Sequence, residues 1–147
     1  MVRRVVSAKV SVSGNVVGSI DDGLIVLLGI HRDDVREDLD WLVQKIVGLR
    51  IFEDSEGKMN TPISANHGML LISQFTLLGN LAKGYRPSFN RAADSLIGEN
   101  LYNKFFEEVK AKFSGTLAAG VFGQDMKITA VDDGPVTIWL DSHNRKY

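Results

Sequence analysis

The chain has 147 residues, of which 44% are hydrophobic and 24% charged, and its formal net charge is -1. This composition indicates one globular domain over residues 1–147, without the positive excess of proteins that grip duplex DNA by its phosphates. We therefore expect no DNA partner, and any RNA would be held locally. The absence of cysteine excludes disulfides and thiolate chemistry. Because no apolar run approaches the roughly 20 residues of a membrane-spanning helix, we expect a cytoplasmic protein without membrane contact.

The first third of the chain alternates predicted strands and turns. β-branched residues dominate three segments, which predict strands at residues 2–12, 16–20 and 24–30. Residues 13–15 and 21–23 separate them and have the composition of tight turns.

A helical period follows, because apolar residues recur every three to four positions up to Ile46. Asp33 or Asp34 is the expected N-cap of this helix, and Gly48 lies near its expected end. A second helix is predicted over about residues 92–113.

The other segments predict short strands and one long loop. The loop covers residues 78–88. The strands are expected at residues 50–52, 68–77, 117–122, 126–131 and 136–140. The resulting order, βββ-α-ββ-α-βββ, predicts an α+β fold in which a mainly antiparallel sheet or open barrel packs with two helices.

The usual signs of side-chain catalysis are missing. His31, His67 and His143 lie on separate predicted elements, where a surface or turn position is the ordinary interpretation. The sequence has no metal-binding motif, no nucleophile elbow and no phosphate-binding glycine loop. We expect neither a metal nor a cofactor.

Two segments could carry chemistry without such groups. Ser73, Gln74, Phe75 and Thr76 follow an apolar run and could present hydroxyl, amide and backbone N–H groups to an oxyanion. The alternative is a strand end whose polar side chains satisfy the backbone. The second segment contains Gly134-Pro135, which fits a specially shaped strand start or a simple turn.

Together, these segments resemble the two signature motifs of the D-aminoacyl-tRNA deacylase family, which here are Ser73-Gln74-Phe75-Thr76-Leu77 and Gly134-Pro135-Val136-Thr137. The resemblance covers essentially the whole chain. Further matching segments occur in the family's order at residues 50–54, 57–60, 86–89, 122–126 and 140–142.

The resemblance implies an activity and an assembly. The family hydrolyses the ester of D-aminoacyl-tRNA, so the expected partner is the aminoacylated 3′ end of tRNA, with glycyl-tRNA as a second substrate. It forms a homodimer with active sites at the subunit interface. Its Gly-cisPro motif, here Gly134 and Pro135, enters the partner's pocket and rejects L-amino acids by exclusion. Arg4 matches the arginine that holds this dipeptide.

The resemblance also implies roles for the first motif. Ser73, Gln74, Phe75 and Thr76 would form the catalytic side of the pocket, with backbone N–H groups at the ester carbonyl and the tRNA 2′-hydroxyl helping to activate water. A competing model makes Thr76 a nucleophile, but the sequence offers it no identifiable base. Arg86 and Phe89, in the following loop, would border the adenosine pocket.

The sequence departs from the family pattern in four places, two of them single residues and two of them short segments. Arg3 stands where glutamine is usual, and Asp132 stands where asparagine is common. Residues 79–83 differ from the usual loop, and residues 145–147 extend past the usual end.

Two other functions remain open at this point. One is a non-catalytic tRNA- or nucleotide-binding domain of the same fold. The other is an interaction protein that uses Trp41 and Trp139 for assembly, although this leaves the paired motifs unexplained.

Overall fold

The computed structural model describes residues 1–146. Within this range the chain forms eight strands, two α-helices and one short 3-10 helix, η1. The elements in chain order are β1 (Val2–Val12), β2 (Asn15–Ile20), β3 (Gly23–Leu28), α1 (Arg36–Val47), β4 (Phe52–Glu53), β5 (Met59–Thr61), β6 (Gly68–Ser73), η1 (Phe75–Leu78), α2 (Ser95–Lys112), β7 (Thr116–Ala119) and β8 (Met126–Ile138). The α+β class is confirmed, although three strands rather than two separate the helices, and two rather than three follow α2.

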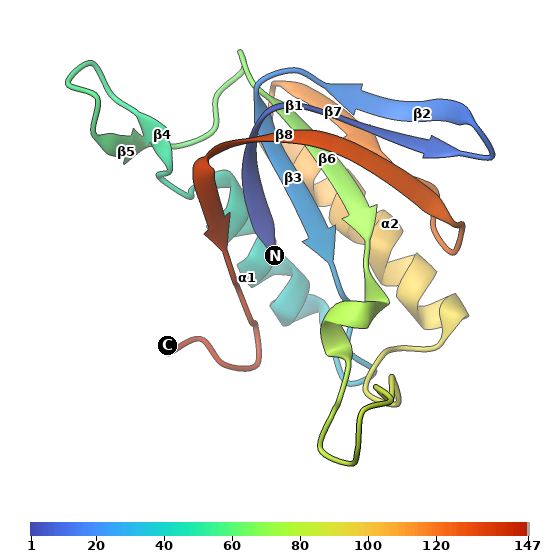
Figure 1. Ribbon diagram of the computed structural model, residues 1–147. Helices are drawn as coiled ribbons and strands as arrows, with labels where there is room; N and C mark the ends of the chain where they lie inside the picture. The colour runs from blue at the N-terminus through green and yellow to red at the C-terminus, as the bar shows by residue number, and fades with distance from the viewer. Residues whose placement is uncertain (147) are drawn as a thin grey trace.

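Six strands form one sheet in the order β2-β1-β3-β6-β7, and β8 pairs with β1 off this path. β1, β2, β3 and β8 pair antiparallel, whereas β3, β6 and β7 are mutually parallel. The prediction of a mainly antiparallel sheet holds for three of its five strand pairings, and the other two are parallel. The reason is that helices α1 and α2 return the chain to the starting edge after β3 and β6, and such crossovers join parallel strands. β4 and β5 form a separate hairpin that extends away from the sheet in Figure 1.

The main sheet curls until β2 approaches β7, which confirms the predicted open barrel. A Cβ atom on Gly18 of β2 would lie 2.7 Å from the carbonyl oxygen of Ala119 in β7, so only glycine allows this approach. Apolar side chains fill the concave side of the sheet. They are Val5, Ala8, Val10, Ile20, Ile25, Leu27, Leu70 and Ile72.

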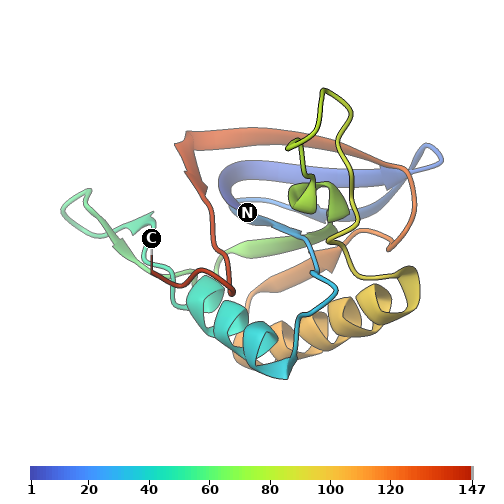
Figure 2. The same cartoon turned by 90° about the horizontal axis from the view of Figure 1, so that it is seen from below.

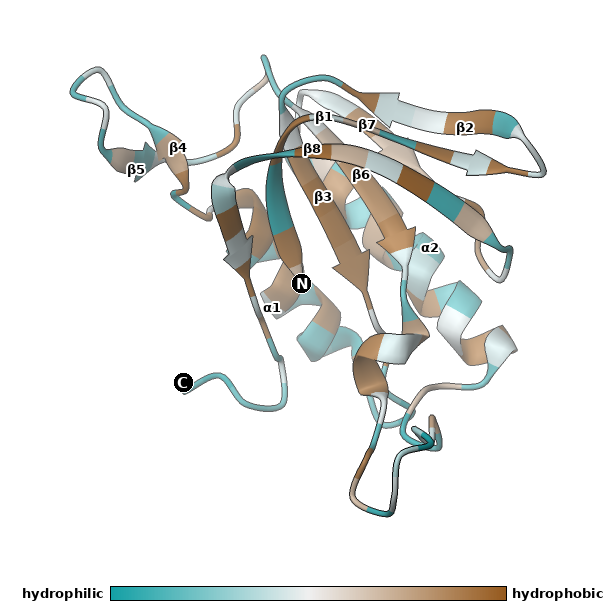
Figure 3. Ribbon diagram, in the orientation of Figure 1, coloured by the Kyte–Doolittle hydropathy of each residue, from teal (hydrophilic) through white to brown (hydrophobic). Residues whose placement is uncertain are grey.

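Both helices cover the opposite face of the sheet, as Figure 2 shows. A second apolar cluster fills this layer, and Phe105 and Val109 of α2 are almost fully buried in it. β3 and β6 lie between the two clusters, which explains why they are hydrophobic along nearly their whole length in Figure 3.

The start of α1 differs from the prediction. Val35, rather than Asp33 or Asp34, is the N-cap residue. The Asp34 carboxylate instead accepts a hydrogen bond from the N–H of His31, and the Asp38 carboxylate accepts one from the N–H of Val35. Within the described residues, no helix is long and apolar enough to cross a membrane.

Candidate functional site

A cavity of about 610 Å³ lies where the carboxyl end of β6, the start of α2 and the β7–β8 loop meet. Four of the predicted site residues contribute to its lining: Ser73, Gln74, Phe75 and Phe89. The structure therefore brings the first motif and part of the following loop into one concave site, the usual form of a small-ligand site.

The first motif forms a turn out of the sheet. β6 ends at Ser73, and the N–H of Gln74 donates to the Leu28 carbonyl of β3 at 2.8 Å. The chain then enters η1 at Phe75, so the predicted strand is too long by four residues. The side-chain amide of Gln74 donates to the hydroxyl of Thr76.

The backbone N–H groups of Phe75 and Thr76 have no acceptor within residues 1–146. This follows from their place at the start of η1, because the first N–H groups of a helix have no partner in the helix itself. Phe75 lines the cavity and Thr76 follows it directly in the chain, so both donors belong to the turn that borders the cavity.

Three phenylalanines, Phe75, Phe89 and Phe122, form part of the cavity wall. Phe75 is 57% exposed and meets the edge of Phe89, with 5.0 Å between ring centroids. Phe122, from the β7–β8 loop, lies 5.6 Å from the ring of Tyr102. Aromatic surfaces of this kind can stack on a nucleobase.

Tyr102 supports the cavity from behind. Its buried hydroxyl donates to the Leu71 carbonyl of β6 at 3.0 Å, and the N–H of Gly120 donates to the same oxygen at 2.9 Å. Burial raises the pKa of Tyr102 to about 12. One carbonyl thus joins α2, β6 and the segment that leads into the β7–β8 loop.

The loop between β7 and β8 supplies lining residues to which the sequence analysis assigned no role. They are Phe122, Gly123, Gln124 and Asp125. In the sequence they were noticed only as part of the segment at residues 122–126 that resembles the family, and that resemblance does not indicate a function. Asp125 forms an exposed ion pair with Lys127 at 3.0 Å. Among residues 1–146, no histidine lines the cavity.

Two of the residues predicted in the first motif and the loop after it do not line the cavity. Thr76 is exposed and sits one residue beyond the lining residue Phe75. Arg86 is exposed in the loop between η1 and α2, which extends from the body in Figure 1.

The second motif lies on a bulge of β8. Arg3 pairs with Thr137 and Val5 pairs with Asp132, so residues 133–136 stand opposite Arg4 alone. Gly134 has a φ of 108°, in the region that favours glycine. Gly134 and Pro135 are both exposed.

Arg4 contacts this bulge. Its side chain is 8% exposed, its Nη1 donates to the Ile51 carbonyl, and its Nε lies 2.8 Å from an oxygen of Asp133. The last contact is an ion pair without hydrogen-bond geometry, since Nε has no hydrogen-bond partner. A Cβ on Gly134 would lie 3.1 Å from Nη2 of Arg4, so the guanidinium packs directly against the glycine.

The expected cis bond is not present. Within residues 1–146 every peptide bond is trans, including that between Gly134 and Pro135. β8 pairs with β1 on both sides of the bulge, which holds the chain extended there, and the trans isomer is the favoured one for X–Pro bonds. The prediction of a Gly-cisPro motif is therefore corrected to a trans Gly-Pro bulge.

One chain does not bring its two motifs together. The strand register can be followed across the sheet from β8 through β1 and β3 to β6. In this register, Asp132 is level with Gly68 at the start of β6, and Ile138 is level with Leu71. The Gly-Pro bulge therefore lies level with the first half of β6, whereas the cavity lies beyond its carboxyl end at Ser73. Neither Gly134 nor Pro135 lines the cavity.

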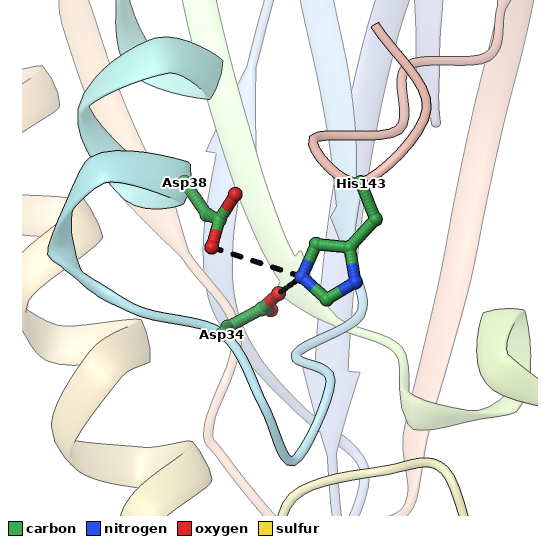
Figure 4. Close-up of side chains that lie close together, drawn as sticks. All are labelled: Asp34, Asp38 and His143. Carbon is green, nitrogen blue, oxygen red and sulfur yellow. Dashed lines mark ion pairs between the residues drawn. The ribbon is translucent and has the colours of Figure 1, made fainter.

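A separate cluster joins the C-terminal segment to α1 (Figure 4). Nε2 of His143 lies 2.9 Å from Asp34 and 3.7 Å from Asp38, and Arg145 donates to Asp38 at 3.1 Å. His143 is also 4.9 Å from the ring of His31, so two histidines expected to be isolated meet here.

Burial dominates at Asp34 and raises its pKa, although the His31 N–H and the charge of His143 offset part of the rise. At Asp38 burial acts in the same direction, but the Val35 N–H and Arg145 outweigh it and lower its pKa. The two aspartates and His143 are close enough to share a metal ion. The bonds already made to their carboxylates account for the cluster without one.

Comparison with known proteins identifies the family. A family model described as D-Tyr-tRNA(Tyr) deacylase matches residues 1–141. The D-aminoacyl-tRNA deacylase of Opitutus terrae is 48% identical over 147 residues, which cover 99% of this chain and 98% of that protein. The D-aminoacyl-tRNA deacylase of Natranaerobius thermophilus is 49% identical over 148 residues, which cover 100% of this chain and 98% of that protein.

Two solved structures share the fold. The c-Myc DNA Unwinding Element Binding Protein superposes with a TM-score of 0.89 at 37% identity over 95% of each chain. A probable eukaryotic D-amino acid tRNA deacylase superposes with a TM-score of 0.74 over 91% of this chain and 93% of that one, but at 19% identity it shows the fold alone. On the family model and the full-length identities, the chain belongs to the D-Tyr-tRNA(Tyr) deacylase family.

Proposed function

We propose that this protein hydrolyses the ester bond of D-aminoacyl-tRNA and so removes wrongly attached D-amino acids. Family membership makes it an ester hydrolase. The observation that carries the substrate assignment is the turn at the end of β6, which borders a 610 Å³ cavity lined in part by phenylalanine rings and contains two backbone N–H groups without an acceptor in residues 1–146. An ester carbonyl and a terminal adenosine are the groups that such a site accommodates.

Catalysis in this proposal depends on backbone groups and on the substrate. The N–H groups of Phe75 and Thr76 stabilise the oxyanion that forms when water attacks the ester carbonyl. The 2′-hydroxyl of the terminal adenosine helps to activate that water. This assignment is consistent with the absence of histidine from the described lining.

A nucleophilic role for Thr76 is less well supported. Its hydroxyl accepts a hydrogen bond from the Gln74 amide, and an amide N–H is not a base. In the proposed mechanism Gln74 and Ser73 hold the shape of the turn, and Thr76 acts through its backbone N–H.

Chiral selection is assigned to Gly134 and Pro135 of a second subunit. Because the bulge and the cavity are separated within one chain, the dipeptide can reach a cavity only if that cavity belongs to another copy. We therefore propose a homodimer with active sites at the interface. The dipeptide occupies the space that an L side chain would need, so D-aminoacyl and glycyl esters are accepted.

The tRNA is held mainly at its 3′ end. Phe75 and Phe89 offer ring surfaces for the adenine, and Arg86 on the exposed loop can reach a phosphate. A net charge of -1 is consistent with local rather than extended contact with RNA. We further propose that the enzyme acts in the cytoplasm without a cofactor.

The decisive experiment compares D-tyrosyl-tRNA with L-tyrosyl-tRNA as substrates. Selective hydrolysis of the D-ester, together with a dimer in sedimentation, is the expected result. Equal hydrolysis of both esters would contradict the exclusion model. Tight tRNA binding without hydrolysis would instead favour the alternative, a non-catalytic tRNA- or nucleotide-binding domain of this fold.

A pair of variants tests the backbone donors directly. Phe75→Pro removes one N–H at the first position of η1, where proline is tolerated, and Phe75→Ala removes the ring but keeps the N–H. We expect Phe75→Pro to lower kcat by about 10²-fold relative to Phe75→Ala, the usual effect of losing an oxyanion donor. Equal kcat values for the two variants would exclude Phe75 as a donor.

The nucleophile model has its own test. Thr76→Val removes the hydroxyl and keeps both the shape of the side chain and the N–H. We expect nearly unchanged kcat, whereas loss of turnover with normal tRNA binding would return the hydroxyl to the chemistry.

A further inference from the structure

The Gly134–Pro135 bulge is exposed, yet a role in chiral selection requires it to hold one position. The bulge places four residues of β8 opposite Arg4 alone, which interrupts the ladder of backbone hydrogen bonds between β1 and β8. Pro135 has no N–H to contribute. Side chains must therefore supply the restraint that the ladder does not.

Arg3 spans the base of the bulge. In the strand register Arg3 is paired with Thr137, the first residue after the bulge. Its guanidinium reaches back to Asp132, the last residue before the bulge. Nε donates to Oδ1 at 3.0 Å and Nη2 donates to Oδ2 at 2.7 Å. This two-bond geometry fixes direction as well as distance.

Arg4 restrains the bulge from the other face. Successive residues of a strand point to opposite faces, so Arg3 and Arg4 approach from opposite sides. Arg4 is nearly buried and contacts Asp133, Gly134 and the Ile51 carbonyl. Arg3 and Asp132 have side chains that are 27% and 38% exposed, so their ion pair is accessible to salt.

We propose that Arg3 and Asp132 are a coupled pair of positioning residues that sets the orientation of Gly134–Pro135 and thereby the preference for D- over L-esters. The structure shows that Arg3 and Asp132, which lie 129 positions apart in the chain, are each other's partners across the base of the bulge. An uncharged glutamine–asparagine pair at these positions can bridge the same gap by a neutral hydrogen bond. When only one of the two residues is charged, the hydrogen bonds between them are lost, and only Arg4 on the other face restrains the bulge.

The proposal rests on the proposed function, because it concerns the selectivity of that reaction. It is tested by a double-mutant cycle of Arg3→Gln, Asp132→Asn and the two together. We expect each single variant to lower the ratio of D-ester to L-ester kcat/KM by about five-fold, the upper range for a partly exposed ion pair. The double variant should return to within about two-fold of the original ratio.

Salt supplies a second measurement within the same cycle. Raising ionic strength from about 0.05 M to about 0.5 M should lower the D-to-L ratio of the unmodified protein and leave that of the neutral double variant unchanged. Salt also weakens tRNA binding, but the two substrates share the same tRNA and this effect cancels in the ratio.

The matched control is Arg36→Gln. Arg36 also forms ion pairs through a partly exposed guanidinium, with Asp40 and Glu108, and it lies on α1 away from the bulge. This variant should keep the original D-to-L ratio. The proposal would be overturned if the single variants of Arg3 and Asp132 lowered thermal stability but kept the D-to-L ratio. It would also be overturned if the D-to-L ratio of the double variant were no higher than that of the more impaired single variant.

Amide hydrogen exchange separates this proposal from the proposed function. Exchange at residues 133, 134 and 136 should quicken in each single variant and slow again in the double variant, whether or not the protein hydrolyses either ester. A protein with no preference for D-esters would contradict the proposed function. Unchanged exchange at the bulge would contradict the positioning role itself.

Discussion

Replacing Tyr102 with phenylalanine removes one hydroxyl from a buried junction behind the cavity. The hydroxyl donates to the Leu71 carbonyl at 3.0 Å, but the N–H of Gly120 donates to the same oxygen at 2.9 Å. The acceptor therefore keeps a partner when the hydroxyl is lost. We expect a loss of about 1 kcal/mol in the free energy of unfolding rather than the larger penalty of an orphaned buried group.

Urea unfolding at 25 °C measures this loss, and a thermal midpoint lower by about 2–4 °C should accompany it for a domain of this size. Tyr85→Phe is the matched control, because the Tyr85 side chain is fully exposed and should contribute nothing. A loss above about 3 kcal/mol for Tyr102→Phe would show that Gly120 does not satisfy the carbonyl, and the shared-acceptor argument would fail.

The raised pKa of Tyr102 adds an alkaline test with a definite sign. The ordinary value is 10.0 and the folded value is about 12, so the unfolded chain loses its proton first as pH rises. The folded state therefore loses stability between pH 10 and pH 12, by linkage. Tyr102→Phe lacks this contribution, and the stability difference between the two proteins should shrink over that range. A constant difference would contradict the raised pKa.

Three further predictions concern the fold, the C-terminal cluster and the cavity. Gly23→Ala should destabilise by more than about 3 kcal/mol in urea unfolding, since its Cβ would lie 1.9 Å from the Gly68 carbonyl oxygen; a smaller loss would mean that β3 and β6 can separate there. The lowered pKa of Asp38 implies stability that is present above its ordinary value of 3.8 and lost as pH falls below it. The advantage of the native protein over Asp38→Asn should therefore shrink as pH falls below about 4, and an advantage independent of pH would refute the lowering by the Val35 N–H and Arg145. Phe89→Ala should raise KM for D-aminoacyl-tRNA about ten-fold with little change in kcat, through lost stacking on the adenine, and a kcat effect alone would place Phe89 elsewhere in the mechanism.

Local sequence patterns predicted most strands because each is a short β-branched run between turn residues. The predicted strands at residues 2–12 and 16–20 match β1 and β2 to within one residue. β8 was harder, because Gly134-Pro135 interrupts its pattern and favours a break into two strands. The structure instead continues one strand through a bulge, since β1 supplies pairing partners on both sides. Pairing between distant segments is not visible in a local pattern.

The candidate site was predicted only in part, again because contacts between distant segments are not visible in a local pattern. The motif at Ser73–Thr76 could be found as a polar interruption of an apolar strand, but the partners of Arg3 and Arg4 on β8 could not. Those contacts join residues about 130 positions apart, so they depend on the strand register. Nothing in the residues themselves indicates that Arg3 faces Asp132 rather than solvent.

The place of the cavity, by contrast, follows from topology. β3, β6 and β7 are parallel, and segments that follow each of them line the cavity: Leu28 and Ile30 at β3, Ser73 to Phe75 at β6, and Phe122 to Asp125 after β7. Ligands in sheets with parallel strands bind beyond the carboxyl ends of those strands, because the loops there are free to diverge. The two strand–helix–strand connections were visible in the sequence, and each implies a parallel pair. Taken as crossovers, they predict a concave candidate site at this edge before any catalytic residue is considered.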